Sequence, residues 1–128
     1  MKEAEIRAGD WLDPDAGSIP FETYATSWVA ERPNLRPKTV QLYEGLVRLH
    51  LVPVLSSLGV RTVAEVKEST VRKWRKKLLD SGVGPVTVAK AYRLLKAIMS
   101  TAVDDGLIKR NPCRIDGAGQ EHSPSGRS

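Results

Sequence analysis

The sequence predicts an all-α fold, and two observations carry this prediction. Proline and glycine divide residues 18–114 into four pieces, and in each piece the apolar residues recur at spacings of three and four, as on one side of a helix. No segment longer than residues 60–63 has the alternating pattern of a β-strand. The chain has 128 residues, 41% of them hydrophobic, which is enough for one globular domain.

The first predicted helix begins just after Ser18 and Pro20. Its apolar residues form one stripe that we expect to be buried: Phe21, Tyr24, Ala25, Trp28 and Val29. The second predicted helix begins at Pro37, because a proline lacks the amide hydrogen that a first helical position leaves unpaired. We expect Pro53 to end or kink this helix.

The two sides of the second helix differ in character. The side expected to be buried carries Leu42, Leu46 and Leu49, with Tyr43 and Val47 beside them. The opposite side carries Lys38, Gln41, Gly45 and Arg48. A glycine inside a helix costs about 1 kcal/mol relative to alanine, so Gly45 is either tolerated at that cost or needed for close approach of another molecule.

The third predicted helix buries Val71, Trp74 and Leu78 and ends at Gly82. Val83 is expected to pack back on Leu78 in a Schellman motif. The remaining surface of this helix carries the densest charge in the chain: Arg72, Lys73, Arg75, Lys76 and Lys77.

The fourth predicted helix is the longest, from Gly84-Pro85 to a second Schellman-like ending at Gly106-Leu107. Its apolar stripe covers about one third of the circumference and consists of Val88, Ala91, Leu95, Ile98, Met99 and Ala102. Opposite this stripe lie Lys90, Arg93, Lys96, Ala97 and Ser100.

The positive charge is concentrated in the middle of the chain. Residues 18–114 hold 17 basic and 8 acidic side chains, a net charge of +9, whereas residues 1–17 have a net charge of −3 and residues 115–128 of −1. A compact basic domain indicates a polyanionic partner, most often nucleic acid.

No pattern in the sequence indicates an active site or a metal centre. His50, His122 and the single Cys113 cannot supply a zinc-ligand set of ordinary spacing. A glycine-rich phosphate loop and a nucleophile elbow are also missing from the sequence. One cysteine allows no internal disulfide, which favours a reducing compartment, and the apolar runs are too short to span a membrane. We therefore expect no catalytic residue, no metal, no cofactor and no membrane partner.

The order and spacing of several short motifs resemble one family. The motifs are Phe21-x-x-Tyr24-x-x-x-Trp28, Pro37-Lys38-Thr39, His50-Leu51-Val52-Pro53, Leu58-Gly59 and Gly106-Leu107-Ile108-x-x-Asn111-Pro112. Over residues 18–114 they resemble the core-binding domain of phage-type tyrosine recombinases, also called integrases. The resemblance implies a SAM-like bundle of four to five helices, arranged as two crossed helical hairpins, that binds double-stranded DNA at the recombination core site.

The two ends of the chain resemble connecting segments of the same family. Residues 1–17 contain Trp11-Leu12-Asp13-Pro14, which is similar to a linker from an upstream arm-binding module. Residues 115–128 are similar to a flexible linker toward a catalytic domain. The resemblance implies that the catalytic tyrosine, arginines, lysine and His-x-x-Arg element lie in that other domain, so we expect this chain to cleave no DNA. It also implies other integrase protomers as partners and a cytoplasmic location in a bacterial cell, on the nucleoid.

The family's second and fourth helices approach DNA, which assigns candidate DNA-binding residues here. On the second helix they are Lys38, Thr39, Gln41, Arg48 and His50, and on the fourth they are Thr87, Lys90, Arg93 and Lys96. The two threonines are placed where hydroxyls and free amides at a helix start can hold a phosphate, but they are equally ordinary first-turn residues. His50 either contacts DNA or makes a local structural hydrogen bond. The third helix of the family lies mostly away from the duplex, so its basic run is expected to face solvent.

Two other functions remain open on the sequence alone. The chain could be a protein interaction module whose first helix and tail after Pro112 dock on a neighbouring recombinase protomer. It could also be a helical transcription regulator, although the fourth helix begins with Pro85, Val86 and Val88 and not with the polar residues of a recognition helix. A salt-dependent shift with duplex DNA separates a DNA-binding module from an interaction protein.

Overall fold

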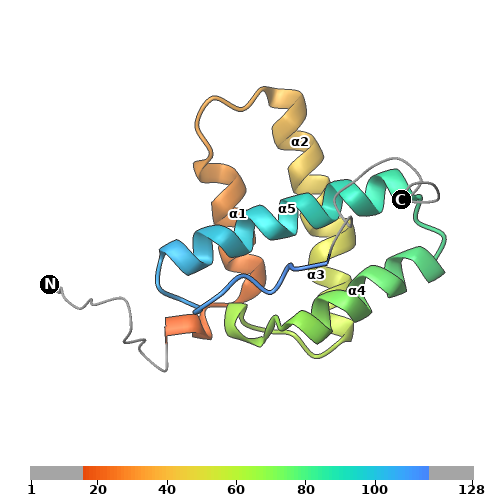
Figure 1. The fold of residues 1–128 in the computed structure, drawn as a ribbon. Helices are drawn as coiled ribbons and strands as arrows, with labels where there is room; N and C mark the ends of the chain where they lie inside the picture. Colours follow the sequence, from red (N-terminus) through yellow and green to blue (C-terminus); the bar gives the residue numbers. More distant parts are fainter. Residues whose placement is uncertain (1–15, 116–128) are drawn as a thin grey trace, which may run out of the picture.

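The structure is a computed structural model, and it describes residues 16–115 (Figure 1). The α-helices are α1 (Phe21–Glu31), α2 (Pro37–Leu46), α3 (Val52–Ser57), α4 (Glu68–Asp80) and α5 (Pro85–Asp104). Three shorter helical turns are η2 (Ala16–Ser18), η3 (Val47–Leu51) and η4 (Val63–Glu65). Within these residues the extended pairing is limited to one isolated bridge, between Pro20 and Thr62. The all-α prediction is confirmed.

The helices form two hairpins that cross, as Figure 1 shows. In the first hairpin α1 lies beside α2, which continues through η3 into α3 as one rod. In the second hairpin α4 lies beside α5, and α5 runs across the rod, where it contacts η3. The expected arrangement of two crossed hairpins is therefore present.

Helix α5 forms the centre of the hydrophobic core. Its buried residues are Val88, Ala89, Ala91, Tyr92, Leu94, Leu95, Ile98, Met99 and Ala102. They include the whole predicted stripe, and Ala89, Tyr92 and Leu94 widen it because α5 is covered from more than one side. The other hairpin and α4 complete the core with side chains such as Phe21, Leu51 and Trp74.

Both predicted Schellman endings are confirmed. Gly82 has a φ of 90°, and the Val83 amide donates to the carbonyl oxygen of Leu78 at 3.1 Å. Gly106 has a φ of 77°, and the Leu107 amide donates to the carbonyl oxygen of Ala102 at 2.9 Å. These positive φ values strain residues that carry a Cβ atom, which explains glycine at both helix ends.

Pro53 neither ends the second helix nor separates it into two rods. The chain widens into the π-helical turn η3 immediately before α3, and Pro53 occupies the first turn of α3. A proline cannot donate to the carbonyl four residues earlier, and a π turn re-spaces the hydrogen bonds around it. The Trp74 indole Nε1 then donates to the carbonyl oxygen of His50 at 2.8 Å, which ties α4 to the π turn.

The prediction that Leu42 and Leu49 are buried is wrong. Leu42 is 43% exposed and Leu49 is 58% exposed, whereas Leu46, Val47 and Leu51 are buried. Helix α2 packs mainly against α1 and so buries only a narrow strip of its surface. The π turn then changes the helical phase, so that Leu51 faces the core in place of Leu49.

The first described residues are held against the segment that contains η4. Near the first end, Phe21 donates its amide to the carbonyl oxygen of Arg61, and the buried Gly17 lies against Ala64. Most of the predicted linkers, residues 1–17 and 115–128, lies outside the described residues, as does His122. The division of the chain into these linkers and a domain over 18–114 stays a prediction.

Candidate nucleic-acid interface

The exposed side of α5 carries a basic strip, which we define as Lys90, Arg93 and Lys96. Arg93 and Lys96 are exposed and Lys90 is half-buried. No other described residue forms an ion pair or a hydrogen bond with the side chain of Lys90 or of Lys96, whereas Arg93 is engaged in an interaction. Nine of the 20 residues of α5 are buried, so these three side chains are carried by a helix that is packed into the core.

A second polar surface lies on the rod formed by α2 and η3. Its polar members Lys38, Gln41 and Arg48 are exposed, as predicted. Helical spacing places Leu42 and Leu49 on the edge of the same surface, so this surface is partly apolar. We call it the α2 face and define it as Lys38, Gln41, Leu42, Gly45, Arg48 and Leu49.

Gly45 lies in the middle of the α2 face and has open space above it. A Cβ atom built on Gly45 would meet no atom within 4 Å apart from its two neighbours and the backbone of its own helix. Packing within this chain therefore does not require a glycine there. Both explanations from the sequence stay open: a glycine tolerated at its cost, and close approach of another molecule.

The two candidate threonines occupy equivalent places at helix starts. Thr39 follows Pro37 and Thr87 follows Pro85, each as the third residue of its helix, and both are half-buried. Neither Arg36 nor Gly84, the residues that precede these helices, caps the first turn with a side chain. The amide groups of both first turns are thus not satisfied by a side-chain cap, which is the condition for holding an anion there.

His50 lies in the π turn and is half-buried. The carbonyl oxygen of His50 accepts a hydrogen bond from the Trp74 indole, 24 residues further along the chain, so this bond involves the backbone of His50 and not its side chain. The imidazole has no hydrogen-bond partner among the described residues.

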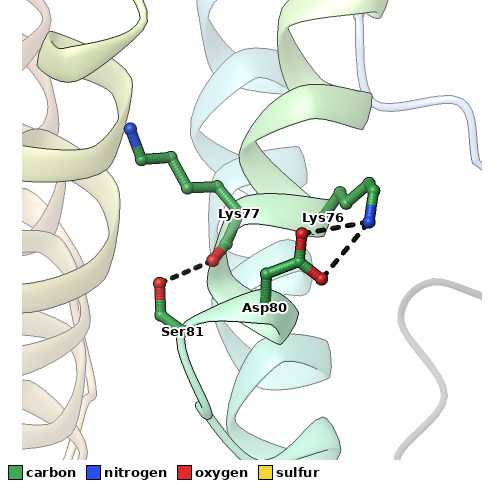
Figure 2. Close-up of polar contacts among 4 residues, drawn as sticks. All are labelled: Lys76, Lys77, Asp80 and Ser81. Carbon is green, nitrogen blue, oxygen red and sulfur yellow. Dashed lines mark hydrogen bonds and ion pairs between the residues drawn. The ribbon is translucent and has the colours of Figure 1, made fainter.

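The basic run of α4 is mainly exposed, as predicted for a solvated face: Arg72, Lys73, Lys76 and Lys77 are exposed and Arg75 is half-buried. Lys76 pairs with the carboxylate of Asp80 at 3.0 Å, and the Ser81 hydroxyl donates to the carbonyl oxygen of Lys77 at 2.7 Å (Figure 2). Lys77 also donates its ammonium to the hydroxyl of Ser57 at 2.9 Å. Part of this charge therefore has partners within the chain.

The motif Gly106-Leu107-Ile108-x-x-Asn111-Pro112, which we call the closing motif, helps to fix the chain after α5 onto this helix. The sequence did not predict this role. The Asn111 side chain donates through Nδ2 to the carbonyl oxygen of Lys96 at 2.9 Å and accepts the amide of Cys113 at 2.8 Å. Further along, the Tyr92 hydroxyl accepts the amide of Ile115 at 2.9 Å. Residues 111–115 are thus held against the middle of α5, beside the basic strip.

Two further groups with reactive chemistry, the Cys113 thiol and the Tyr24 hydroxyl, are buried or hydrogen-bonded within the fold. The Cys113 thiol is buried, and burial raises its pKa to about 12. The Tyr24 hydroxyl donates to Asp105 at 2.6 Å, and burial together with this hydrogen bond raises the pKa of Tyr24. Among residues 16–115, no three His, Cys, Asp or Glu side chains gather as a metal site would need. None of the described helices is both long and apolar enough to span a bilayer.

Comparison with known proteins gives relatives that are much longer than this chain. No protein-family model matches, and no solved structure matches significantly. The integrases of Mycobacterium phages FRAT1 and D29 are each 39% identical to this chain over 104 residues, which cover 79% of the chain but 28% and 25% of those proteins. A XerC-like tyrosine recombinase of Caldanaerobacter subterraneus is 26% identical over 121 residues, 88% of this chain and 30% of that protein. The chain spans about a quarter to three tenths of the length of these relatives.

Proposed function

Because this chain is a relative of phage integrases and tyrosine recombinases over part of their length, we propose that it is a DNA-binding module of such a recombinase. In this proposal it grips duplex DNA at the recombination core site. The observation that carries the proposal is the α5 basic strip. Lys90 and Lys96 are held on a buried helix with no ion-pair partner among the described residues, and cations placed in this way suit the phosphates of a polyanion.

The α2 face supplies a second set of contacts in this proposal. Gln41 and Arg48 are side-chain types that bond the edges of adenine and guanine, and Leu42 and Leu49 suit the methyl group of thymine. In this proposal the exposed Lys38 contacts phosphate. The uncapped amides near Thr39 and Thr87 suit further phosphates, and the half-buried His50 lies next to Leu49 on the rod.

We assign strand cleavage to another part of the recombinase. Tyr92 is buried and hydrogen-bonded to the backbone of Ile115, and Tyr24 and Tyr43 are half-buried on packing faces. In this proposal none of these hydroxyls acts as the nucleophile toward DNA. In this proposal the module acts with other recombinase protomers, in the bacterial cytoplasm on the nucleoid.

Fluorescence anisotropy with a labelled duplex tests the proposal. With phosphate contacts dominant, we expect dissociation constants on the order of 10⁻⁴ to 10⁻⁶ M at physiological salt, with tighter binding at low salt. An anisotropy that does not change even at low salt would rule out the proposal.

A protein interaction module is the second candidate, and the exposed Leu42 and Leu49 favour it, since large apolar side chains on one surface are typical of docking sites. Sedimentation of the chain without DNA separates the two. Self-association that is lost in Leu49→Ser, together with no response to duplex, would favour the interaction module.

A further inference from the structure

A groove of about 440 Å³ lies between η4 and the closing motif. Its apolar lining includes Val66, Leu107 and Ile108, and its basic lining consists of Lys67, Lys109 and Arg110. Glu68 also lines it, but this carboxylate is already paired with Arg114 at 3.1 Å. The groove thus combines an apolar surface with basic groups that are exposed.

The first described residues lie against this groove. A Cβ atom on Gly17 would lie 2.5 Å from the Cβ of Ala64 and 2.9 Å from the carbonyl oxygen of Leu107. Ala64 and Leu107 both line the groove, and η2 packs against η4. Gly17, one residue after the first described residue, therefore lies beside the groove.

The segment just before Ala16 has the chemistry that this groove would accept. Trp11 and Leu12 are adjacent large apolar residues, and three acidic residues surround them: Asp10, Asp13 and Asp15. Four residues separate Trp11 from Ala16, and the five steps from one to the other span up to about 17 Å when extended, so Trp11 can reach a groove that begins next to Gly17. Tryptophan gains more than most residues from being buried, because of its large apolar area.

We propose that Trp11 and Leu12 dock into this groove of their own chain. Their flanking carboxylates, at Asp10, Asp13 and Asp15, then lie near the ammonium and guanidinium groups of Lys67, Lys109 and Arg110. The docked segment sets the direction from which residues 1–10 approach the helical domain. This proposal does not depend on whether the chain binds DNA.

Nuclear magnetic resonance of the full chain tests the docking through its three tryptophan indoles. The indoles of Trp28 and Trp74 donate hydrogen bonds inside the fold, to Thr101 and to His50, so their signals report on folding. The third signal is assigned to Trp11 by its loss in Trp11→Phe. We expect nuclear Overhauser contacts from the Trp11 indole to methyl groups of Leu107 and Ile108, unchanged when the protein is diluted.

A pair of charge reversals supplies the matched control. Lys109→Glu should weaken these contacts at low salt, whereas Lys73→Glu, an equal change at an exposed site on α4, should leave them intact. An indole of Trp11 with the shift of a free tryptophan and no such contacts would overturn the proposal. Contacts that vanish on dilution would also overturn it, since the groove would then bind a second copy of the chain.

Discussion

The substitution Gly45→Ala separates the stability of the α2–η3 rod from its proposed contact with DNA. Gly45 lies inside α2, where alanine is favoured over glycine by about 0.8–1 kcal/mol. A Cβ atom at this position meets nothing within 4 Å in the described chain, so no clash offsets the gain. We therefore expect the free energy of unfolding to rise by nearly the full helix-propensity difference.

The stability gain is large enough to measure. A change of 1 kcal/mol moves the melting temperature of a domain of this size by roughly 4–8 °C. DNA binding should change in the opposite direction, because the added methyl group holds the phosphate strand away from α2. The loss of one such contact, at about 0.5–1.5 kcal/mol, corresponds to roughly 2- to 12-fold weaker binding.

Circular dichroism melts and duplex anisotropy measure the two effects separately. Thr26→Ala provides the control, because Thr26 is exposed on α1 and the change also raises helix propensity without touching the α2 face. It should stabilise the chain and leave DNA binding unchanged. A Gly45→Ala chain that is no more stable would contradict the open space at this glycine. Stabilisation with unaltered binding would refute the close approach of DNA to α2.

Three further results are expected. The double variant Lys90→Ala, Arg93→Ala should bind duplex DNA more weakly than the double variant Lys76→Ala, Lys77→Ala. Each lost phosphate contact should also reduce the slope of log K against log salt by roughly 0.9. If both variants remain folded and the α4 variant loses more affinity, α4 faces the duplex. A suicide DNA substrate carrying the core site should form no covalent adduct with the chain, and a tyrosine adduct seen by mass spectrometry would refute our assignment of catalysis elsewhere. Burial raises the pKa of Cys113 from 9.0 to about 12, so the unfolded state loses the thiol proton first as the pH rises. The free energy of unfolding should therefore fall above about pH 9, by up to about 1.4 kcal/mol per pH unit. Urea titrations of Cys113→Ala should lack this part of the pH dependence.

The sequence predicted most helix limits because their causes are local. Pro37 and Pro85 begin helices, and Gly82 and Gly106 end them, through backbone properties that do not depend on the rest of the fold. The buried side of α5 could also be predicted from the sequence, since its apolar residues recur at helical spacing over the 20 residues of the helix.

What the sequence did not predict depends on partners far along the chain. Helical periodicity marks Leu42 and Leu49 as apolar but does not show that α2 is covered from one side only. The hydrogen bond between Tyr24 and Asp105 joins residues 81 positions apart, and no local pattern announces it. The hydrogen bond from the Trp74 indole to the His50 carbonyl oxygen in the π turn likewise joins residues that no local pattern connects.

The candidate interface follows the same division. The α5 basic strip could be predicted, because one exposed side remains once the apolar stripe is assigned. The α2 face could be predicted only in its polar part. Its leucines were assigned to the core, and the groove beside Gly17 depends on two segments, 63–68 and 107–112, that no sequence pattern connects.

The hydrogen bonds between residues 111–115 and α5 change the point from which the following chain leaves the domain. Without the hydrogen bonds from Asn111 to Lys96 and from Ile115 to Tyr92, the following chain would leave at the end of α5, at Asp104. With these bonds, the following chain leaves beside Tyr92, which lies about 18 Å from Asp104 along the helix axis at 1.5 Å per residue. A segment that continues after Ile115 therefore starts close to Lys96, and its local concentration is highest near this part of the α5 basic strip.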